Sequence, residues 1–320
     1  MIFLLNFKYT LPIYVEMSYY MLITRNGGIF MKKVKPLLAI MLILILIIPT
    51  GAAKKTSSKW ILTEYNDASG NQGICYTLTN NHNKLIVIDG GFEANADKLR
   101  NIIKANGNHI DAWILTHPHP DHIGAFRKIY SNLQGIKISA IYDNGLDLEF
   151  YRQNPNTGDD VQLYDNYINE IKGDWRVHHL KRNELLKIDG LKIKVFNTYD
   201  QYSKYLSHDI CNDSSLMLKV TTHKNSILFC GDCHSESTAK LLIKKYGKRL
   251  RANYVQMGHH GNNTLPNNFY SLVHPKVALF DAPQWLVDGK DYDTKKNMEF
   301  MKSIGAEVYY YATAPNQFKL

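Results

Sequence analysis

The chain has 320 residues and a formal net charge of +9, and 45% of its residues are hydrophobic and 21% are charged. This ordinary globular composition excludes a disordered chain and a collagen-like one. The length accommodates one large domain or two small ones.

The first 53 residues differ from the rest of the chain. Several lysines precede a 12-residue apolar run over 37–48, and a proline and small residues follow it. This layout is typical of a secretory signal peptide, and the run is shorter than the roughly 20 residues that a membrane span needs. We therefore interpret 31–53 as a signal peptide or an uncleaved N-terminal anchor. Residues 1–30 are interpreted as a mis-called extension ahead of a start at Met31. The protein is predicted to be secreted or held at the cell surface.

The charge of the remaining chain is modest. Residues 1–53 hold five basic residues and one acidic residue, so the rest carries a net charge of +5. This surplus is compatible with an anionic substrate, but we find no dense run of Lys and Arg that would grip a long polyanion. The stretch 240–251 has six basic residues. Much of it lies on a predicted helix, which favours a solvated face.

From residue 60 onward, apolar periodicity predicts β-hairpins followed by alternating strands and helices. In the first half we expect strands at 60–65, 75–79, 85–88, 111–115 and 136–142, and helices at 92–105 and 123–131. In the second half we expect strands at 191–196, 216–221, 226–230, 253–257, 277–280 and 308–311, and helices at 235–246, 266–273 and 294–303. This order fits two packed sheets with helices outside. The polar, Tyr-rich residues 147–172 are predicted to be an insertion over the site rather than core.

The most informative segment directly follows the predicted strand 111–115. It carries His117, His119, Asp121 and His122 within six residues. Imidazole and carboxylate ligands together suit zinc, manganese or iron. Two prolines in the segment fix φ, so the loop is stiffened before a metal binds. We expect these ligands to lie in a loop.

Three other predicted strands also end in polar residues that bind metals. Asp89 follows one of them, Asp232 follows a second, and the pair His259 and His260 follows a third. All candidate ligands therefore come after the carboxyl ends of predicted strands. A sandwich of two sheets can bring such positions together at one rim.

Four cysteines lie beyond the N-terminal segment: Cys75, Cys211, Cys230 and Cys233. An exported protein permits disulfides, and four cysteines allow three pairings. The last two have the C-x-x-C spacing of a redox or zinc pair. Because Cys230 ends an apolar strand and no second C-x-x-C exists, we favour a buried free thiol there.

Taken together, these motifs resemble the metallo-β-lactamase superfamily over about residues 60–312. The similar subgroup contains the hydrolase domain of the competence protein ComEC and the exported teichoic-acid phosphorylcholine esterases. The resemblance implies an α/β fold, a four-layer αββα metallo-β-lactamase sandwich, in one hydrolase domain over 60–320. It also implies two divalent metal ions, with zinc first and manganese or iron as alternatives.

The resemblance implies a role for each candidate residue. His117 and His119 would hold one ion; Asp121, His122 and His259 would hold the second; and Asp232 would bridge the two. Asp121 would also accept a proton. His260 would either hydrogen-bond the substrate or the neighbouring loop or bind a metal, and these two are the candidate catalytic residues. Asp89 is either a turn residue or a support that orients the motif loop.

The sequence departs from the superfamily pattern in two places. Most members supply another histidine between the main motif and the bridging aspartate. Here His208 and Asp213 are the nearest candidates for that third ligand, and the motif places neither well. The chain also ends soon after Tyr311, so we expect a final family strand to be missing or irregular.

The resemblance implies an exported dinuclear metal-dependent hydrolase that uses a hydroxide held between the two ions, and we favour a phosphodiesterase. Its substrate would be an anionic small-molecule, cell-wall or nucleic-acid phosphoester. One alternative is a ComEC-type nuclease linked to DNA uptake, and another is a non-catalytic binding protein on the same fold. We predict no stable protein partner and membrane contact only through an uncleaved N-terminal segment.

Overall fold

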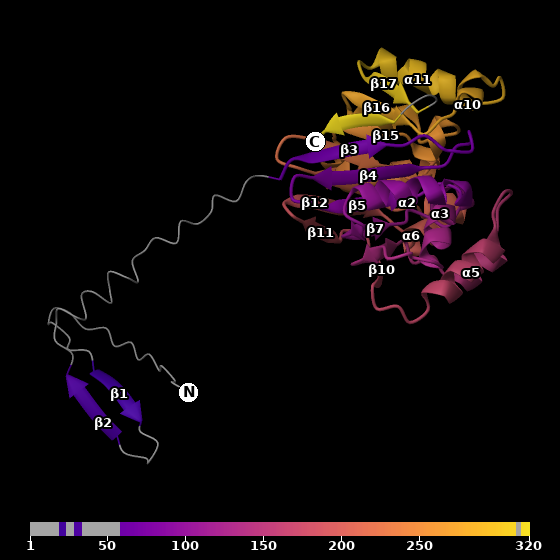
Figure 1. Cartoon of the computed structure of the whole chain (residues 1–320). Coiled ribbons are helices and arrows are strands. Elements are labelled where there is room, and N and C mark those ends of the chain that lie inside the picture. Colours follow the sequence, from indigo (N-terminus) through magenta and orange to yellow (C-terminus); the bar gives the residue numbers. More distant parts are fainter. Residues whose placement is uncertain (1–18, 24–28, 34–57, 312–314) are drawn as a thin grey trace. The chain divides into compact units, whose positions relative to one another are not determined.

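The computed structural model describes residues 19–23, 29–33, 58–311 and 315–320. The chain forms two units, 1–56 and 57–320. In the first, strands β1 (Tyr19–Ile23) and β2 (Ile29–Lys33) pair as an antiparallel hairpin (Figure 1). The apolar core of the predicted signal peptide lies outside the described residues. Among the residues that are described, no helix has the length and apolar composition that a membrane span requires.

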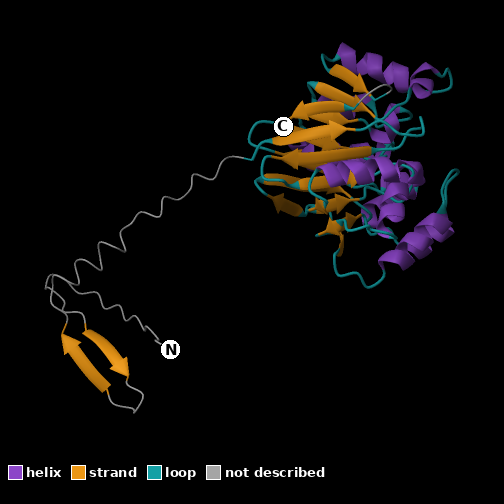
Figure 2. Cartoon of the chain, in the orientation of Figure 1, coloured by secondary structure: helices purple, strands orange, loops and turns teal. Residues whose placement is uncertain are grey.

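The described residues of the second unit include two seven-stranded sheets (Figure 2). Across the first sheet the strands are β10 (Val177–His179), β9 (Ile141–Asp143), β7 (Ala112–Ile114), β5 (Leu85–Asp89), β4 (Cys75–Asn80), β3 (Trp60–Glu64) and β18 (Asn316–Lys319). The pairs from β18 to β5 are antiparallel and those from β5 to β10 are parallel.

The second sheet repeats this change from antiparallel to parallel pairing. Its strands are, in order, β11 (Leu185–Ile188), β12 (Leu191–Asn197), β13 (Met217–Thr221), β14 (Ser226–Phe229), β15 (Tyr254–Gln256), β16 (Val277–Phe280) and β17 (Glu307–Tyr310). The pairs are antiparallel as far as β14 and parallel beyond it. A small parallel pair, β6 (His109–Ile110) with β8 (Lys137–Ile138), lies apart from both sheets.

Helices complete the unit. The α-helices are α2 (Ala96–Ala105), α3 (Pro120–Tyr130), α4 (Leu148–Gln153), α5 (Val161–Ile171), α6 (Gln201–Leu206), α7 (Ile210–Asp213), α8 (Glu236–Tyr246), α9 (Asn267–Val273), α10 (Gln284–Asp288) and α11 (Thr294–Ser303). Three short 3-10 helices are η1 (Glu93–Asn95), η2 (Gly247–Leu250) and η3 (Gly258–Gly261).

Three buried apolar clusters separate four layers. The central cluster contains Leu62 and Ile86 of the first sheet and Leu218 of the second, so it joins the two sheets. A second cluster packs helices, among them α2 and α3, on the first sheet, and a third packs others, among them α8 and α9, on the second. Each fully buried large aliphatic or aromatic side chain contributes roughly 1.5–3 kcal/mol to stability. The predicted four-layer αββα arrangement is confirmed.

Three sequence-based expectations about the first half are wrong. Helix α3 begins at Pro120 and not at Ile123. Proline suits the first position of a helix because its missing N–H is unpaired there in any case, so Asp121 and His122 lie in the first helical turn. The strand expected at 136–142 is divided between β8 and β9. Residues 147–172 contribute to the core, since Tyr151, Tyr164 and Tyr167 are buried beside helix α3.

The C-terminal expectation is also wrong. A final strand, β18, is present and pairs antiparallel with β3 in the first sheet. Its partner lies more than 250 residues earlier in the chain, at register Asn316 to Glu64. Local periodicity carries no information about such a distant pairing. The short elements β10, β11, α6, α7 and α10 were likewise not predicted.

Candidate metal centre

The candidate ligands gather at one edge of the two sheets. Parallel strands place their carboxyl ends on the same side of a sheet, and the polar residues follow those ends. In the first sheet Asp89 ends β5, and the segment after β7 carries the histidine motif. In the second sheet Asp232 follows β14, His260 follows β15, and Asp281 follows β16.

Asp232 lies at the middle of the group. Its Oδ2 atom is 3.3 Å from Nε2 of His122, 3.2 Å from Nε2 of His260 and 3.9 Å from Nε2 of His117. Oδ2 of Asp121 is 3.2 Å from the same Nε2 atom of His260. All five side chains are buried. The structure therefore brings two carboxylates and three imidazoles together in one buried group.

His119 extends this group through His117. Nδ1 of His119 lies 3.1 Å from Nε2 of His117. Nε2 of His119 lies 2.7 Å from Oδ1 of Asp159, a residue in the connection between α4 and α5. Because Nε2 is occupied by the carboxylate, Nδ1 is the nitrogen that His119 presents toward His117.

Asp89 orients the start of the motif. Its carboxylate accepts hydrogen bonds from the backbone N–H of Thr116 at 2.7 Å and from the Thr116 hydroxyl at 2.8 Å, and it lies 2.8 Å from Nδ1 of His122. Its carbonyl oxygen accepts a bond from the Trp113 indole at 2.9 Å. Asp89 adopts φ of 56°, a left-handed conformation that Asp and Asn tolerate better than most residues. It is therefore both a turn residue and a support for His122.

The tautomers of two further histidines follow from similar contacts. The Thr116 hydroxyl donates to Asp89, so its oxygen is left to accept from Nδ1 of His117, 3.2 Å away. Nδ1 of His260 lies 3.2 Å from the backbone carbonyl oxygen of Asp281. An imidazole that donates from Nδ1 has, when neutral, its lone pair on Nε2, so the neutral form of each ring would direct a lone pair toward Asp232.

Several side-chain atoms that face the middle of the group have no hydrogen-bond partner in the described part of the chain. Nε2 of His122, Nε2 of His260 and Oδ1 of Asp232 are buried and make no well-aligned hydrogen bond with any described residue. Buried polar atoms without partners are uncommon and call for an explanation. Here they converge on a shared space, and their nitrogen and oxygen chemistry suits a divalent ion of the zinc, manganese or iron type. These residues therefore fit the metal ions that the sequence resemblance implies.

Charges within the group shift the pKa values strongly. Burial opposes a charge on His260, yet the nearby carboxylates of Asp232 and Asp121 raise its pKa to about 10. Burial likewise opposes a charge on His122, but Asp232 and Asp89 raise its pKa well above the usual value. Burial, aided by nearby His122, instead lowers the pKa of His117. His122 and His260 are therefore protonated at neutral pH, and a bound cation would displace these protons.

His259 and His260, the two adjacent histidines that follow β15, point in different directions. His260 is the one that lies beside Asp121, His122 and Asp232, as a set of four potential ligands. The ring of His259 instead stacks on His234, with centroids 5.2 Å apart. Its Nδ1 atom is buried and has no hydrogen-bond partner among the described residues. The ligand role predicted for His259 is therefore better matched by the position of His260.

Neither residue considered as a third ligand for the first ion reaches the group. Both carboxylate oxygens of Asp213 are occupied, since Oδ1 accepts from the backbone N–H groups of His234 and Ser235 and Oδ2 accepts from Ser207. His208 is exposed. Asp213 therefore fixes the chain that follows Asp232 and has no free oxygen for an ion.

Gln256 was not identified from the sequence, yet it connects the strand ends beneath the group. Its side-chain oxygen accepts from the backbone N–H groups of Cys230 and Gly231 at 2.8 and 2.9 Å. Its amide nitrogen donates to the carbonyl of Met257 at 2.6 Å and to the Asp281 carboxylate at 3.1 Å. One buried side chain thus joins the ends of β14, β15 and β16, from which Asp232 and His260 emerge.

All four cysteines are buried free thiols. Cys230 and Cys233 lie in the core beneath the second sheet and do not form a disulfide. The preference for a buried thiol at Cys230 is confirmed. Cys211 lies near His119 and Asp159, and one potential ligand atom from each lies within 4.8 Å of the others.

The fold and this group can now be compared with known proteins. Residues 69–188 match the family model of the metallo-β-lactamase superfamily. This part of the chain is therefore similar to the metallo-β-lactamase superfamily, and the four-layer fold agrees with that similarity. A stretch of 82 residues is 37% identical to the uncharacterized protein YcaI of Escherichia coli K12. That match covers 25% of this chain and only 10% of the length of YcaI.

Two solved structures are similar in fold. The metallo-β-lactamase fold protein YhfI of Bacillus subtilis aligns with a TM-score of 0.52 and 12% identity, over 82% of this chain and all of YhfI. A mutant of the β-hydroxylase CmlA aligns with a TM-score of 0.50 and 11% identity, over 82% of this chain and 54% of CmlA. At such identities the likeness establishes the fold and not the reaction.

Proposed function

We propose that this protein is an exported dinuclear metal-dependent hydrolase that cleaves phosphodiesters. The observation that carries the metal-dependent part is the convergence of buried imidazole nitrogens and carboxylate oxygens on Asp232, with the outer nitrogens of the rings engaged elsewhere. Such support from outer contacts fixes ring orientation and raises the basicity of metal-binding histidines. The phosphodiester part rests on the sequence resemblance, and export rests on the N-terminal segment 31–53.

Each residue has a proposed role. His117 through Nε2 and His119 through Nδ1 would hold one ion, and Asp121, His122 and His260 would hold the second. Asp232 would stand between the two ions. His259, the ligand first predicted for the second ion, would instead border the space for the substrate. When bound, zinc or a similar ion lowers the pKa of a coordinated water to near 7 in the best cases and polarises a phosphoryl oxygen.

The surrounding residues prepare the group for this chemistry. Asp89 and Asp159 hold His122 and His119 in one orientation, so little reorganisation is needed during the reaction. Asp121 has Oδ2 beside Nε2 of His260, and although burial opposes its charge, His122 and His260 lower the pKa of its carboxyl, so the ionised carboxylate would be the group that accepts a proton. Burial of Asp232 and His122 keeps bulk water from screening their charges.

The fold alone does not select hydrolysis, since the similar protein CmlA is named a β-hydroxylase. The test is therefore enzymatic. The chain from Lys54 onward would be assayed with bis(p-nitrophenyl) phosphate, p-nitrophenylphosphorylcholine and single-stranded DNA. Its matched control is the double variant Asp121→Ala, His122→Ala.

We expect diester cleavage that the double variant loses. Preference for the choline ester would indicate a cell-wall esterase, and preference for DNA would indicate a nuclease of the ComEC type. Bound metal without cleavage of any diester would contradict the phosphodiesterase proposal and direct the search to other substrates. Absence of both metal and turnover would leave a non-catalytic binding protein.

A further inference from the structure

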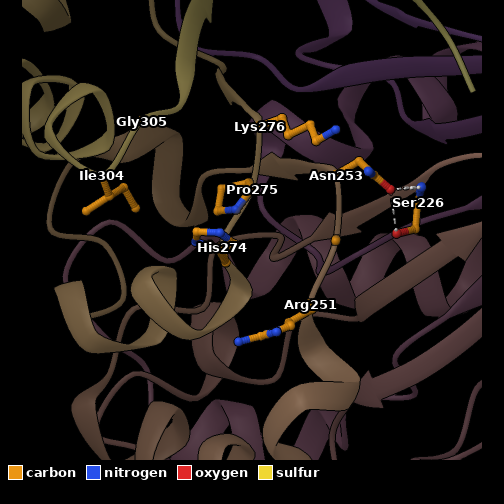
Figure 3. Close-up of a pocket in the computed structure, with 9 residues that line it drawn as sticks. Ser226, Arg251, Asn253, His274, Pro275, Lys276, Ile304 and Gly305 are labelled. Carbon is orange, nitrogen blue, oxygen red and sulfur yellow. Dashed lines mark hydrogen bonds between the residues drawn. The ribbon is translucent and has the colours of Figure 1, made fainter.

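A cavity lies at the end of the second sheet away from the candidate metal centre. It has a volume of about 370 Å³ and is lined by, among others, Ser226, Arg251, Asn253, His274 and Lys276 (Figure 3). Ser226 begins β14, Asn253 precedes β15, and Lys276 precedes β16. These are the amino ends of the strands whose carboxyl ends lead to Asp232 and His260.

The length of β14 sets a minimum separation between the two places. Its four residues, Ser226–Phe229, span roughly 13 Å at about 3.3 Å per residue. Further residues intervene before Asp232. A molecule in the cavity would therefore not contact the candidate metal centre directly.

The cavity is lined by cationic side chains and by no acidic ones. Arg251, His274 and Lys276 are all exposed. Neither Arg251 nor Lys276 forms an ion pair with a carboxylate of the described residues, whereas eight other lysines and arginines do. Glu307 is the acidic residue next to Lys276 across the sheet, and it accepts a hydrogen bond from Tyr309 instead. The cationic groups of Arg251 and Lys276 are thus available to a ligand.

The polar wall of the cavity is fixed by hydrogen bonds. Oδ1 of Asn253 accepts from the backbone N–H and the hydroxyl of Ser226, at 3.0 and 3.4 Å. These bonds, drawn in Figure 3, occupy the oxygen of the Asn253 amide and leave its nitrogen as a donor. Nζ of Lys219 donates to the backbone carbonyls of Arg249 and Arg251, which holds the chain at Arg251.

We propose that this cavity binds the phosphate group of an anionic ligand. Arginine and lysine supply charged donors, and the amide of Asn253 adds a neutral one. These charges favour an anion, and a phosphate group offers three or four acceptor oxygens where a carboxylate offers two. The phosphate group can belong to a free ion or to a polymer. A polymer bound in the cavity would be held away from the metal centre.

The test measures phosphate binding to the full chain loaded with zinc. Backbone amide resonances of 251–253 and 274–276 would be followed during titration with inorganic phosphate and, separately, with long-chain inorganic polyphosphate. The test variant is Arg251→Glu, Lys276→Glu. The matched control is Lys187→Glu, Lys192→Glu, which reverses two exposed, cross-strand lysines outside the cavity and changes the net charge equally.

We expect saturable shifts at these amides and at least ~10-fold weaker binding in the test variant, with the control within about twofold of the parent. The shifts should persist in Asp121→Ala, His122→Ala, since binding at the metal centre is a separate event. Tighter binding of polyphosphate would identify a polymer as the source, and equal binding would identify the free ion. Unchanged affinity in the test variant, or equal losses in test and control, would overturn the proposal.

Discussion

The two ends of strands β14, β15 and β16 carry opposite kinds of electrostatic site. At the carboxyl ends, Asp232 and His260 are buried, and hydrogen bonds from neighbouring segments fix their surroundings. At the amino ends, Arg251 and Lys276 are exposed and have no ionic partner among the described residues. Interactions between charges are strong in a dry interior and screened by water and salt at a surface.

This difference indicates how each end should respond to change. At the buried end, loss of a single atom or charge should disturb several neighbours at once, because they share partners. At the open end, the net charge should matter more than the position of any one atom.

Replacement of Asp232 should have the largest effect. Asp232→Asn removes the charge that lies within 4 Å of three histidine nitrogens. Loss of an outer support costs about 10–100-fold in metal affinity or activity, so loss of this central ligand should cost more than about 100-fold in kcat. Metal content and diester turnover measure the result. If the variant kept its metal content and its diester turnover, Asp232 would not be a bridge between the two ions.

Replacement of Asp89, which supports His122, should have the next largest effect on the metal centre. Asp89→Asn keeps the shape and tolerates φ of 56°, but it removes the negative charge beside His122. Metal affinity, measured by competition with a chelating dye, should fall about 10–100-fold. The control Asp97→Asn changes an exposed carboxylate on α2 and should leave affinity unchanged. Equal affinities for the two variants would contradict a supporting role for Asp89.

Metal uptake should depend on pH. In chelator-treated protein the pKa of His260 is about 10 and that of His122 is raised, so both rings hold protons at neutral pH. Metal binding must displace these protons, so affinity should increase with pH over the neutral range, by up to about tenfold per pH unit for each proton. Calorimetry in buffers of different ionisation enthalpy counts the released protons. Affinity independent of pH would contradict these charge states.

Gln256 should affect stability as well as the metal centre. Gln256→Leu leaves the buried backbone N–H groups of Cys230 and Gly231 without an acceptor, at a cost of about 1–3 kcal/mol for each unsatisfied group. Urea unfolding of metal-free protein should report this loss. Gln162→Leu, on the exposed face of α5, is the control and should change stability by less than about 0.5 kcal/mol. Similar unfolding midpoints for Gln256→Leu and Gln162→Leu would argue against the role of Gln256 in connecting the strand ends.

Reducing agent should have the smallest effect. All four cysteines are buried free thiols, so no disulfide contributes to stability. Loss of a native disulfide typically costs 2–5 kcal/mol, a change easily seen in thermal unfolding. We expect identical unfolding temperatures with and without reductant. A lower unfolding temperature in reductant would reveal a disulfide and contradict this prediction.

The sequence predicted the layers and most of the candidate centre for identifiable reasons. Apolar periodicity defined the long strands and helices, and the spacing of His117 to His122 marked the metal-binding segment. The start of α3 was missed although Pro120 is a recognised signal for the first helical position. Asp159 and Gln256 could not be found in this way, since their contacts join segments that are distant in the chain.

The choice between His259 and His260 shows another limit of sequence patterns. Both follow β15, and both adopt positive φ, 51° and 58°. The directions of their rings depend on this tight turn at η3 and on contacts with His234 and Asp281. A pattern of residue types does not encode those directions. Only the folded backbone distinguishes the two rings.

The most direct test of the account is therefore the metal content of three proteins: the parent, His259→Ala and His260→Ala. Each would be loaded with zinc, freed of excess ion and analysed for zinc per chain. The account predicts two ions in the parent and in His259→Ala, and one in His260→Ala. Loss of an ion from His259→Ala with two retained in His260→Ala, or no bound metal in the parent, would contradict it.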